Sequence, residues 1–337
     1  MRKLLSPGRL LALGLVLLAA TGLTLWLIPS DEYIFLPDRA KAVEPLVTVQ
    51  GERSDDGPGG IYLVDVLVRR ANLLEQLFPS LRSGSTLVPV EAVRPPGVSD
   101  TERRQIDFQS MERSQEIAAA VALRALGRKV KIRPLGALID SIVEGSPADG
   151  ALHEGDVIVA VNGEPVRTPT ELRRVLSRGR AGDEVTLRLR SADGLRRVKL
   201  QTASNPELPG RPFIGVAITE AADIDLPIAV KIDTGEIGGP SAGLAFALTI
   251  VEELGRDVDR GHRVAATGEL QLDGAVLPVG GVKQKTIGAR EAGIDVLVVP
   301  VGDNARVARE HADGIRVLAV VSFRDALRKL ATLRPRR

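Results

Sequence analysis

The sequence predicts an α+β protein in which a transmembrane helix precedes a mixed region, a small β domain and a C-terminal α+β domain. Three observations lead to this prediction. A 19-residue stretch without a charge begins at Leu10, short strands with one capped helix follow residue 128, and strands alternate with helices from residue 206. We therefore expect five parts, with the bounds 1–9, 10–28, 29–127, 128–205 and 206–337.

The composition excludes several classes of site. The 337 residues contain no cysteine, which excludes disulfides, thiolate zinc sites, iron–sulfur clusters and a cysteine nucleophile. A net charge of +2 and 3% aromatic residues indicate no nucleic-acid partner. The three histidines, His153, His262 and His311, are scattered along the chain, and the dipeptide Gly-Lys of a P-loop is absent. We predict neither a metal nor a cofactor, and no ATPase of the P-loop type in this sequence.

The uncharged stretch from Leu10 to Ile28 is close to the roughly 20 residues that a helix needs to cross a bilayer. Arg2, Lys3 and Arg9 precede it, so the positive-inside rule predicts a cytoplasmic N-terminus and an extracytoplasmic body. A cleaved signal peptide is the alternative, but the apolar run continues past the small residues at Ala19-Ala20. We expect a single-pass protein of the cell membrane.

Residues 29–127 carry the weakest patterns. An extended stretch at Leu46–Val49, an alternating run at Ile61–Val68 and a long helical pattern from about Thr101 to Leu126 are recognisable, and Gly127 ends the last of these. We predict a mixed α/β scaffold here, without chemistry.

Residues 128–205 are typical of a small β domain with one helix. Strand patterns occur at Ala137–Ile142 and Asp156–Val161, and Asn162-Gly163 is the dipeptide of a two-residue hairpin turn. Thr168, Pro169 and Glu171 form a capping box at the start of a helix. Its apolar face consists of Leu172, Val175 and Leu176.

The run GSPADGALHEGDVIVAVNG from Gly145 to Gly163 resembles the signature of bacterial PDZ domains. The resemblance implies that an extended peptide binds as an added strand, between the strand at Ala137–Ile142 and the helix. A domain that only packs against its neighbours is the alternative. The peptide-binding residues expected on this basis are Leu135, Gly136, Ala137, Leu172 and Val175.

In the last region, the loop GGPSAG leads into a strongly apolar helix and places Ser241 at the helix N-terminus. Free backbone N–H groups and the helix dipole favour negative charge there, as a tetrahedral oxyanion requires. An N-cap serine without chemistry is one alternative. Another is the G-x-S-x-G nucleophile of a Ser–His hydrolase, with His311 or His262 as the base.

The segment PVGGVKQK puts two lysines, Lys283 and Lys285, in the first turn of a helix, where the dipole disfavours cations. Positions two apart do not share a helix face, so Lys285 turns to water if Lys283 turns inward. A buried lysine has a lowered pKa and can act as a neutral general base. A solvated lysine is the alternative.

Three motifs in this order, GGPSAG, TGEL and GGVKQK, resemble those of the proteolytic domain of Lon-type serine peptidases. The resemblance makes Ser241 the nucleophile, Lys283 its base and Thr267 a hydroxyl that holds the lysine, with support from Gly239 and Ala242 beside the serine. Together with the PDZ-like run, it extends to membrane-anchored, ATP-independent PDZ–Lon proteins of bacteria.

The sequence thus predicts a membrane-anchored serine endopeptidase that cleaves extracytoplasmic peptides or proteins through a Ser–Lys dyad. Peptide or protein substrates and the membrane are the expected partners, and a homo-oligomer is compatible with this interpretation. Two other interpretations remain open: a non-catalytic PDZ adaptor that binds peptides, and a Ser–His hydrolase.

Overall fold

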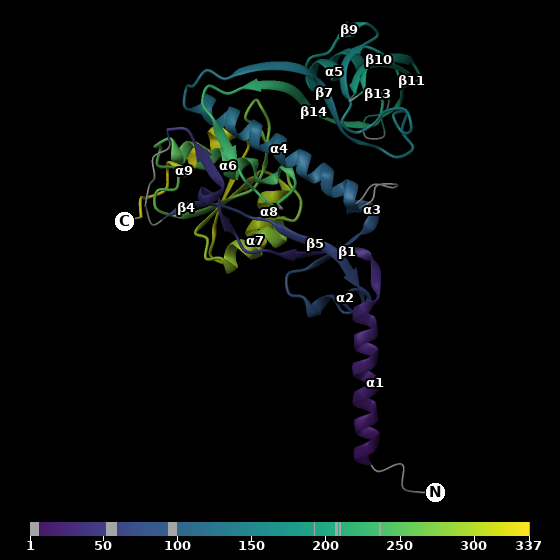
Figure 1. Cartoon of the computed structure of the whole chain (residues 1–337), viewed down its shortest axis with the longest axis vertical. Coiled ribbons are helices and arrows are strands. Elements are labelled where there is room, and N and C mark those ends of the chain that lie inside the picture. Colours follow the sequence, from purple (N-terminus) through teal and green to yellow (C-terminus); the bar gives the residue numbers. More distant parts are fainter. Residues whose placement is uncertain are drawn as a thin grey trace. The chain divides into compact units, whose positions relative to one another are not determined.

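The computed structural model describes residues 7–51, 59–93, 100–191, 193–205, 208, 210–235 and 237–336 (Figure 1). The chain divides into two compact units. Unit 1 combines Met1–Leu126 with Ile228–Arg337, and unit 2 is Gly127–Pro227. Unit 2 is therefore an insertion in the sequence of unit 1. The α+β fold class is confirmed.

The N-terminal helix α1 (Pro7–Leu27) has the length and composition of a membrane span. Its window Leu10–Leu27 has a mean hydropathy of 2.3, and none of it is buried against the protein. The predicted apolar helix is present. Arg2 and Lys3, on which the predicted orientation depends, lie outside the described residues.

An antiparallel sheet with the strand order β5-β1-β6 follows α1 directly. Its register aligns Phe35 of β1 with Val68 of β5 and with Thr86 of β6. The elements of this part are β1 (Pro29–Pro37), β5 (Val66–Asn72), α2 (Leu73–Leu77), η2 (Pro79–Leu81), β6 (Thr86–Pro89) and α3 (Val90–Val93).

The central sheet of unit 1 has the order β2-β4-β16-β19-β20 and takes strands from both ends of the chain. Ile61 of β4 pairs in parallel with Val264 of β16, which in turn pairs with Val296 of β19. The prediction that residues 29–127 form a separate region is therefore wrong, because β4 completes the same sheet as the C-terminal strands. The strands are β2 (Lys41–Ala42), β4 (Gly60–Leu63), β16 (Arg263–Ala266), β19 (Val296–Pro300) and β20 (Arg316–Val320).

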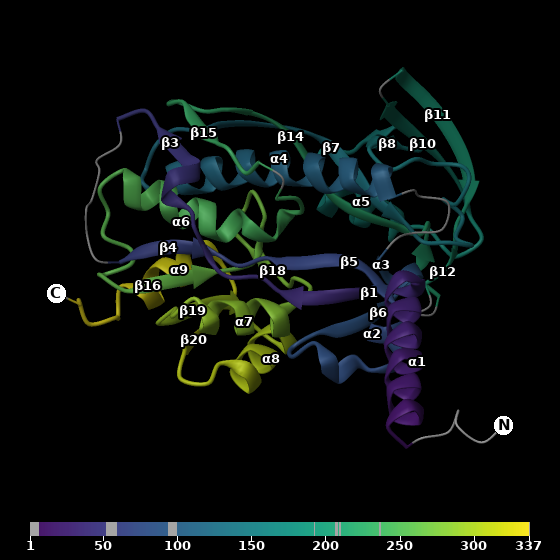
Figure 2. The same ribbon diagram turned by 60° about the horizontal axis from the view of Figure 1, so that its bottom comes forward.

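Helices cover both faces of this sheet. Helix α6 (Gly243–Glu253) and the long α4 (Asp100–Ala125) lie side by side on one face, while α7 (Val282–Glu291) and α8 (Asp303–His311) lie on the other (Figure 2). The residues of α6 from Gly243 to Val251 are all buried, which explains their apolar character. The remaining elements of unit 1 are η1 (Glu44–Leu46), β3 (Val47–Val49), β15 (Val230–Ile232), η3 (Pro240–Ala242), β17 (Glu269–Leu270), β18 (Val276–Leu277) and α9 (Phe323–Leu330).

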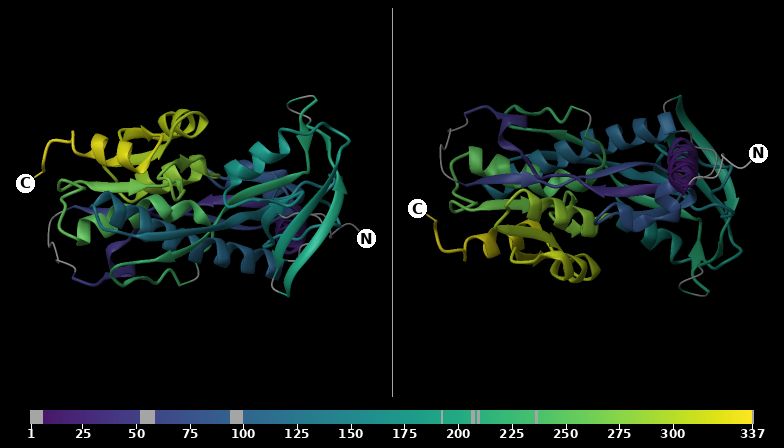
Figure 3. Two further views of the ribbon diagram at one scale, coloured as in Figure 1. Left: turned by 90° about the horizontal axis from the view of Figure 1, so that it is seen from above. Right: turned by 90° about the horizontal axis from the view of Figure 1, so that it is seen from below.

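Unit 2 is a sheet with the order β11-β10-β8-β7-β14, covered by one helix, α5 (Pro169–Leu176). Its two longest strands, β7 (Lys131–Ile142) and β14 (Val216–Asp225), run antiparallel along their whole length (Figure 3). The predicted boundary at residue 205 is therefore too early, because β14 belongs to this sheet. The other strands are β8 (Val157–Val161), β9 (Glu164–Pro165), β10 (Glu184–Ser191), β11 (Gly194–Gln201), β12 (Ala203–Ser204) and β13 (Pro212–Phe213).

The local signals in unit 2 have the geometry that the sequence predicts. Asn162 and Gly163 both have positive φ, 49° and 83°, between β8 and β9. The Thr168 side chain accepts a hydrogen bond from the Glu171 N–H, and Pro169 begins α5. The Glu171 carboxylate accepts from the N–H of Arg167.

The division into two units predicts how fragments of the chain behave. We expect residues 127–227 alone to unfold in one cooperative thermal transition. Residues 228–337 alone should show none, because β16 loses its partner β4 and α6 loses its cover, α4. Circular dichroism melting of both fragments measures this.

A matched control joins residues 29–126 to 228–337 through a Gly/Ser linker, and we expect this chain to regain a cooperative transition. Cooperative melting of residues 228–337 by themselves would contradict the assignment of β4 to the central sheet.

Candidate active site

Ser241 lies in the short helix η3, between the glycine pair at 238–239 and the start of α6. The loop turns into the helix at Gly239, whose φ of 85° favours glycine. Ser241 is half-buried, whereas α6 behind it is buried from Gly243 to Val251. A fixed apolar helix therefore holds the serine at its N-terminal end, as the sequence predicts.

The backbone of Ser241 is held by the two residues that follow strand β16. Its carbonyl accepts hydrogen bonds from the Gly268 N–H at 2.9 Å and from the Thr267 Oγ1 at 3.2 Å. Thr267 is fully buried, and its own N–H donates to the Val298 carbonyl of β19. The sheet thus fixes the position of the serine directly.

The cation beside Ser241 is Lys285. Its Nζ donates to the Ser241 Oγ at 2.8 Å and to the Thr267 Oγ1 at 3.1 Å. Lys285 is 4% exposed although it carries an ammonium group. A serine hydroxyl, a threonine hydroxyl and a buried lysine therefore meet at one point.

Lys283, the lysine expected to face inward, lies elsewhere. Its side chain is half-buried and its Nζ donates to the Ser85 carbonyl at 3.1 Å. The prediction that Lys283 turns toward Ser241 and Lys285 toward water is wrong. Helix α7 directs the face that carries Lys285 toward Ser241, and the face that carries Lys283 toward Ser85.

The residues that follow the two lysines do not distinguish them. Ala289 lies four residues after Lys285, and Ile287 lies four residues after Lys283, so each lysine shares its helix face with an apolar residue. In the structure Ile287 and Ala289 are both buried. The local sequence therefore does not identify Lys285 as the lysine that faces Ser241.

Burial lowers the pKa of Lys285 to about 8, and the negative charge of Asp65 opposes the shift. At pH 7 roughly a tenth of this lysine is then neutral, against less than about 0.1% for a lysine in water. Asp65 lies between β4 and β5, in the region for which the sequence indicated no chemistry. No sequence motif identifies Asp65 as part of the site. It lies near Lys285 because β4, the strand just before it, pairs with β16.

Helix α4 supports the serine loop from its other side. The Ser114 hydroxyl donates to the Pro240 carbonyl at 3.0 Å, and the Asp107 carbonyl accepts from the Gly239 N–H at 2.8 Å. The Gly239 N–H is thus already bonded within the protein. Ala242, the other predicted supporting residue, is buried at the end of η3.

Neither histidine proposed for a Ser–His hydrolase is bonded to Ser241. The His262 Nε2 lies 2.9 Å from the Arg334 carbonyl, and His311 is the last residue of α8. The side chain within hydrogen-bond distance of the serine hydroxyl is that of Lys285.

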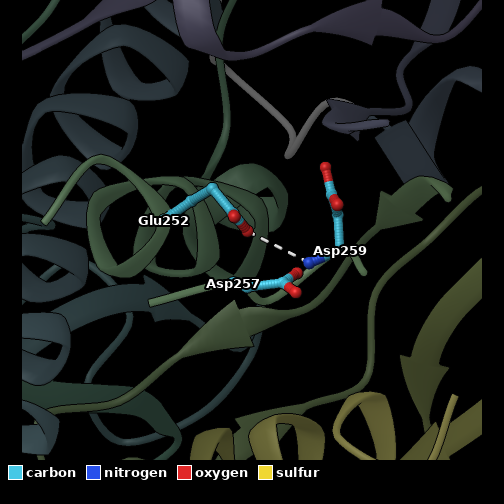
Figure 4. Close-up of side chains that lie close together, drawn as sticks. All are labelled: Glu252, Asp257 and Asp259. Carbon is cyan, nitrogen blue, oxygen red and sulfur yellow. Dashed lines mark hydrogen bonds between the residues drawn. The ribbon is translucent and has the colours of Figure 1, made fainter. Parts of the chain in front are cut away.

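An acidic cluster lies at the opposite end of α6 from Ser241. Glu252, Asp257 and Asp259 place carboxylate oxygens within 4.8 Å of one another (Figure 4). Burial raises the pKa of Glu252 to about 7, and its Oε2 accepts from the N–H groups of Val258 and Asp259. Through these two hydrogen bonds, Glu252 fixes the loop that follows α6 to the end of the helix.

The predicted peptide-binding residues of unit 2 fall in two groups. Leu135 is half-buried on β7 and Val175 partly buried on α5, whereas Ala137 and Leu172 belong to the core, at 0% and 1% exposure. At Gly136 a Cβ would lie 2.5 Å from the Ile158 carbonyl oxygen, so a close approach of strands requires this glycine.

The predicted binding strand is also in the wrong place. Strand β7 pairs with β8 on one side and with β14 on the other, so no edge at Ala137 is free for a peptide. The strand at the edge of the sheet is β14, and it contacts α5. Strand β14 lies beyond residue 205, the end that the sequence patterns predict for this domain.

Two family models match the chain. Residues 138–191 match the PDZ domain, and residues 218–330 match the Lon protease (S16) C-terminal proteolytic domain. The second match contains Ser241, Thr267 and Lys285. The chain contains a PDZ domain followed by a Lon-type serine peptidase domain.

Similar proteins agree with this assignment. The chain is 36% identical over 107 residues to a Lon protease of Clostridium beijerinckii, covering 30% of this chain and 13% of that protein. It is 35% identical over 127 residues to Lon protease 2 of Thermus thermophilus, covering 34% and 16%. Against a Lon protease of Helicobacter pylori it is 40% identical over 111 residues, covering 31% and 13%.

The chain therefore spans between 13% and 16% of the length of these relatives. Among solved structures, the PDZ domain of an SdrC-like protein from Listeria innocua is 26% identical, with a TM-score of 0.23, covering 25% of this chain and 92% of that one. The assignment of the PDZ domain depends on the family model.

The burial of Lys285 predicts a dependence of stability on pH. With a pKa of about 8 when folded and about 10.4 when unfolded, the unfolded chain binds more protons between these values, so wild-type stability rises with pH there. The Lys285→Met variant lacks this rise. The difference in unfolding free energy between the variant and wild type should therefore shift by about 3 kcal/mol in favour of wild type between pH 7 and pH 10.5. Urea unfolding at both pH values measures this difference.

Lys283→Met is the matched control, because it removes the same group from the same helical turn at a half-buried position. If the unfolding free energy relative to wild type changed equally with pH in both variants, the lowered pKa of Lys285 would be contradicted.

Proposed function

We propose that this chain is a serine endopeptidase with Ser241 as its nucleophile and Lys285 as its general base. The observation that carries the proposal is the 2.8 Å contact between the Lys285 Nζ and the Ser241 Oγ, made by a lysine that is 4% exposed. A nucleophilic hydroxyl bonded to a desolvated amine is the arrangement that nucleophilic catalysis requires.

The first step is acylation. Neutral Lys285 takes the proton of the Ser241 hydroxyl while Oγ attacks the carbonyl carbon of the scissile peptide bond. Charge then builds on the carbonyl oxygen, and the positive end of the α6 helix dipole stabilises it. Lys285 returns the proton to the leaving amine as the peptide bond breaks.

Water completes the reaction. Lys285 takes a proton from the water that attacks the acyl-enzyme, and gives it to the Ser241 Oγ as the second product leaves. Thr267 serves in both steps as a positioning residue, because its hydroxyl bonds both the lysine amine and the Ser241 carbonyl. No cofactor enters this sequence of steps.

We further propose that α1 anchors the enzyme in the cell membrane with the body outside the cytoplasm, and that its hydrolysis of peptide bonds does not require ATP. The length and apolar surface of α1 support the anchor. Extracytoplasmic peptides or exposed segments of proteins are the substrates in this proposal.

The PDZ domain has a role of its own in this proposal: it selects substrate by adding a peptide strand to the edge of β14. In the part of the chain that the structure describes, β14 pairs with β7 on one edge only, and α5 lies beside it. Val175, Leu176, Val216 and Ile218 are partly buried there and offer apolar contacts to a peptide.

The proposed dyad predicts which lysine is essential. Lys285→Arg should lower peptide cleavage at least about 10²-fold, because a guanidinium stays protonated and cannot act as base. Lys283→Arg should leave cleavage close to wild type, and Thr267→Val should lower it about tenfold through one lost hydrogen bond. Cleavage of a fluorogenic peptide by the full chain measures all three.

Thermal melting of each variant checks that it is folded, and wild-type activity should rise with pH around a midpoint of about 8. A folded and active Lys285→Arg enzyme would refute the dyad. A Ser241 that a serine-reactive probe cannot label would instead favour the peptide-binding adaptor.

The edge of β14 gives a separate prediction. Val175→Lys should weaken cleavage of a protein substrate several-fold while cleavage of a short fluorogenic peptide stays unchanged, because the charge blocks the apolar contacts beside β14. Leu172 is unsuitable for this test, since its side chain is in the core. Leu195→Lys, at a residue of β11 that is 66% exposed, is the control. If both variants cleaved the protein substrate equally well, the PDZ domain would only pack against its neighbours and would not bind substrate.

A further inference from the structure

Three large apolar side chains are exposed close together on α2 and η2. Leu77 is 60% exposed, Phe78 52% and Leu81 61%. We call these three residues the α2–η2 patch. Scattered apolar residues on a surface are ordinary, but three within five positions form a contiguous feature that needs a partner.

The patch lies where α1 ends. Helix α2 contacts α1, and the Leu73 N–H at the start of α2 donates to the Ile28 carbonyl, immediately after α1, at 3.0 Å. Figures 1 and 2 show α2 beside this end of α1. The apolar surface of α1 is thus followed directly by a second apolar surface.

The segment that carries the patch is held in one conformation. Asn72 and Glu75 form a capping box at the start of α2. Glu75 is 4% exposed, and its carboxylate accepts hydrogen bonds from Arg69 at 2.6 Å and from Arg82 at 3.2 Å. The Glu75 carboxylate faces the protein, whereas Leu77, Phe78 and Leu81 face away from it.

We infer that the α2–η2 patch inserts into the bilayer beside α1, at the interface of the leaflet through which the chain leaves the membrane. This inference rests on the proposed anchoring by α1. The interface accommodates apolar side chains at the depth of the headgroups, and Arg82, 52% exposed by side chain, can bind lipid phosphate. A second protein copy fits less well, because a specific protein interface needs roughly 20–30 residues on each side.

The inserted patch is connected to the proposed active site by a short stretch of chain. Gly84 and Thr86 follow it, and Gln284 of α7 donates to the Gly84 carbonyl at 3.0 Å and to the Thr86 Oγ1 at 2.8 Å. Gln284 is the residue before Lys285 and is 2% exposed. The bilayer thus restrains the segment Gly84–Thr86, and α7, the helix that carries Lys285, packs against this segment.

Site-directed spin labelling tests the insertion, and the absence of cysteine makes each introduced label unique. Phe78→Cys, Leu18→Cys and Val321→Cys are labelled with a nitroxide in the full chain, reconstituted in phosphatidylcholine–phosphatidylglycerol vesicles. All three positions are exposed, at 52%, 73% and 56%. Oxygen concentrates in the bilayer and a nickel chelate stays in water, so power saturation with each reports depth.

We expect the ratio of oxygen to nickel collision rates to be several-fold higher at residues 78 and 18 than at residue 321. A high ratio at residue 18 with the aqueous ratio at residue 78 would overturn the insertion and leave the anchor intact. A label at residue 78 that neither reagent reaches would show a protein contact, such as a second copy, and would also overturn it.

An aqueous ratio at residue 18 would overturn the anchor and the insertion together. Leu81→Cys, 61% exposed, repeats the measurement if Phe78→Cys does not melt like wild type.

Discussion

The burial of one ammonium group is the constraint on which the rest of unit 1 depends. Lys285 loses most of its hydration and receives in return two hydroxyl partners, Ser241 and Thr267. Desolvation of a lysine is unfavourable at neutral pH, so the surrounding structure must hold the three groups together. The buried helix α6, the central sheet and helix α7 each fix one of the three.

The enclosure is built from segments far apart in the sequence. Asp65 and Gly84–Thr86 come from the N-terminal region, and helix α4 bonds the serine loop through Ser114 and the Asp107 carbonyl. The three motifs GGPSAG, TGEL and GGVKQK occupy only the C-terminal third of the chain, but the site that contains them needs both halves of unit 1. The Lon family match, which begins at residue 218, therefore covers less than the folded unit.

Sequence patterns predicted the parts of the site that are local. Ser241 at a helix start depends on neighbouring residues, and the structure places it there. The expectation for Thr267 comes from the resemblance to Lon-type peptidases and not from a local pattern. The choice between Lys283 and Lys285 depends on which face of α7 meets the sheet, and the first turn of a helix does not determine this. Likewise, the edge strand β14 follows from a pairing with β7 about 80 residues earlier, which no local pattern reveals.

The insertion of unit 2 between the halves of unit 1 also sets the order in which a newly made chain can fold. Strand β4 is synthesised about 200 residues before β16, its parallel neighbour. At ribosomal speeds of 5–20 residues per second, this delay is roughly 10 to 40 s. The inserted domain is completed during that interval. Until the C-terminal third appears, Ile61 and Leu63 lie on a strand with one open edge, which another nascent chain can pair with.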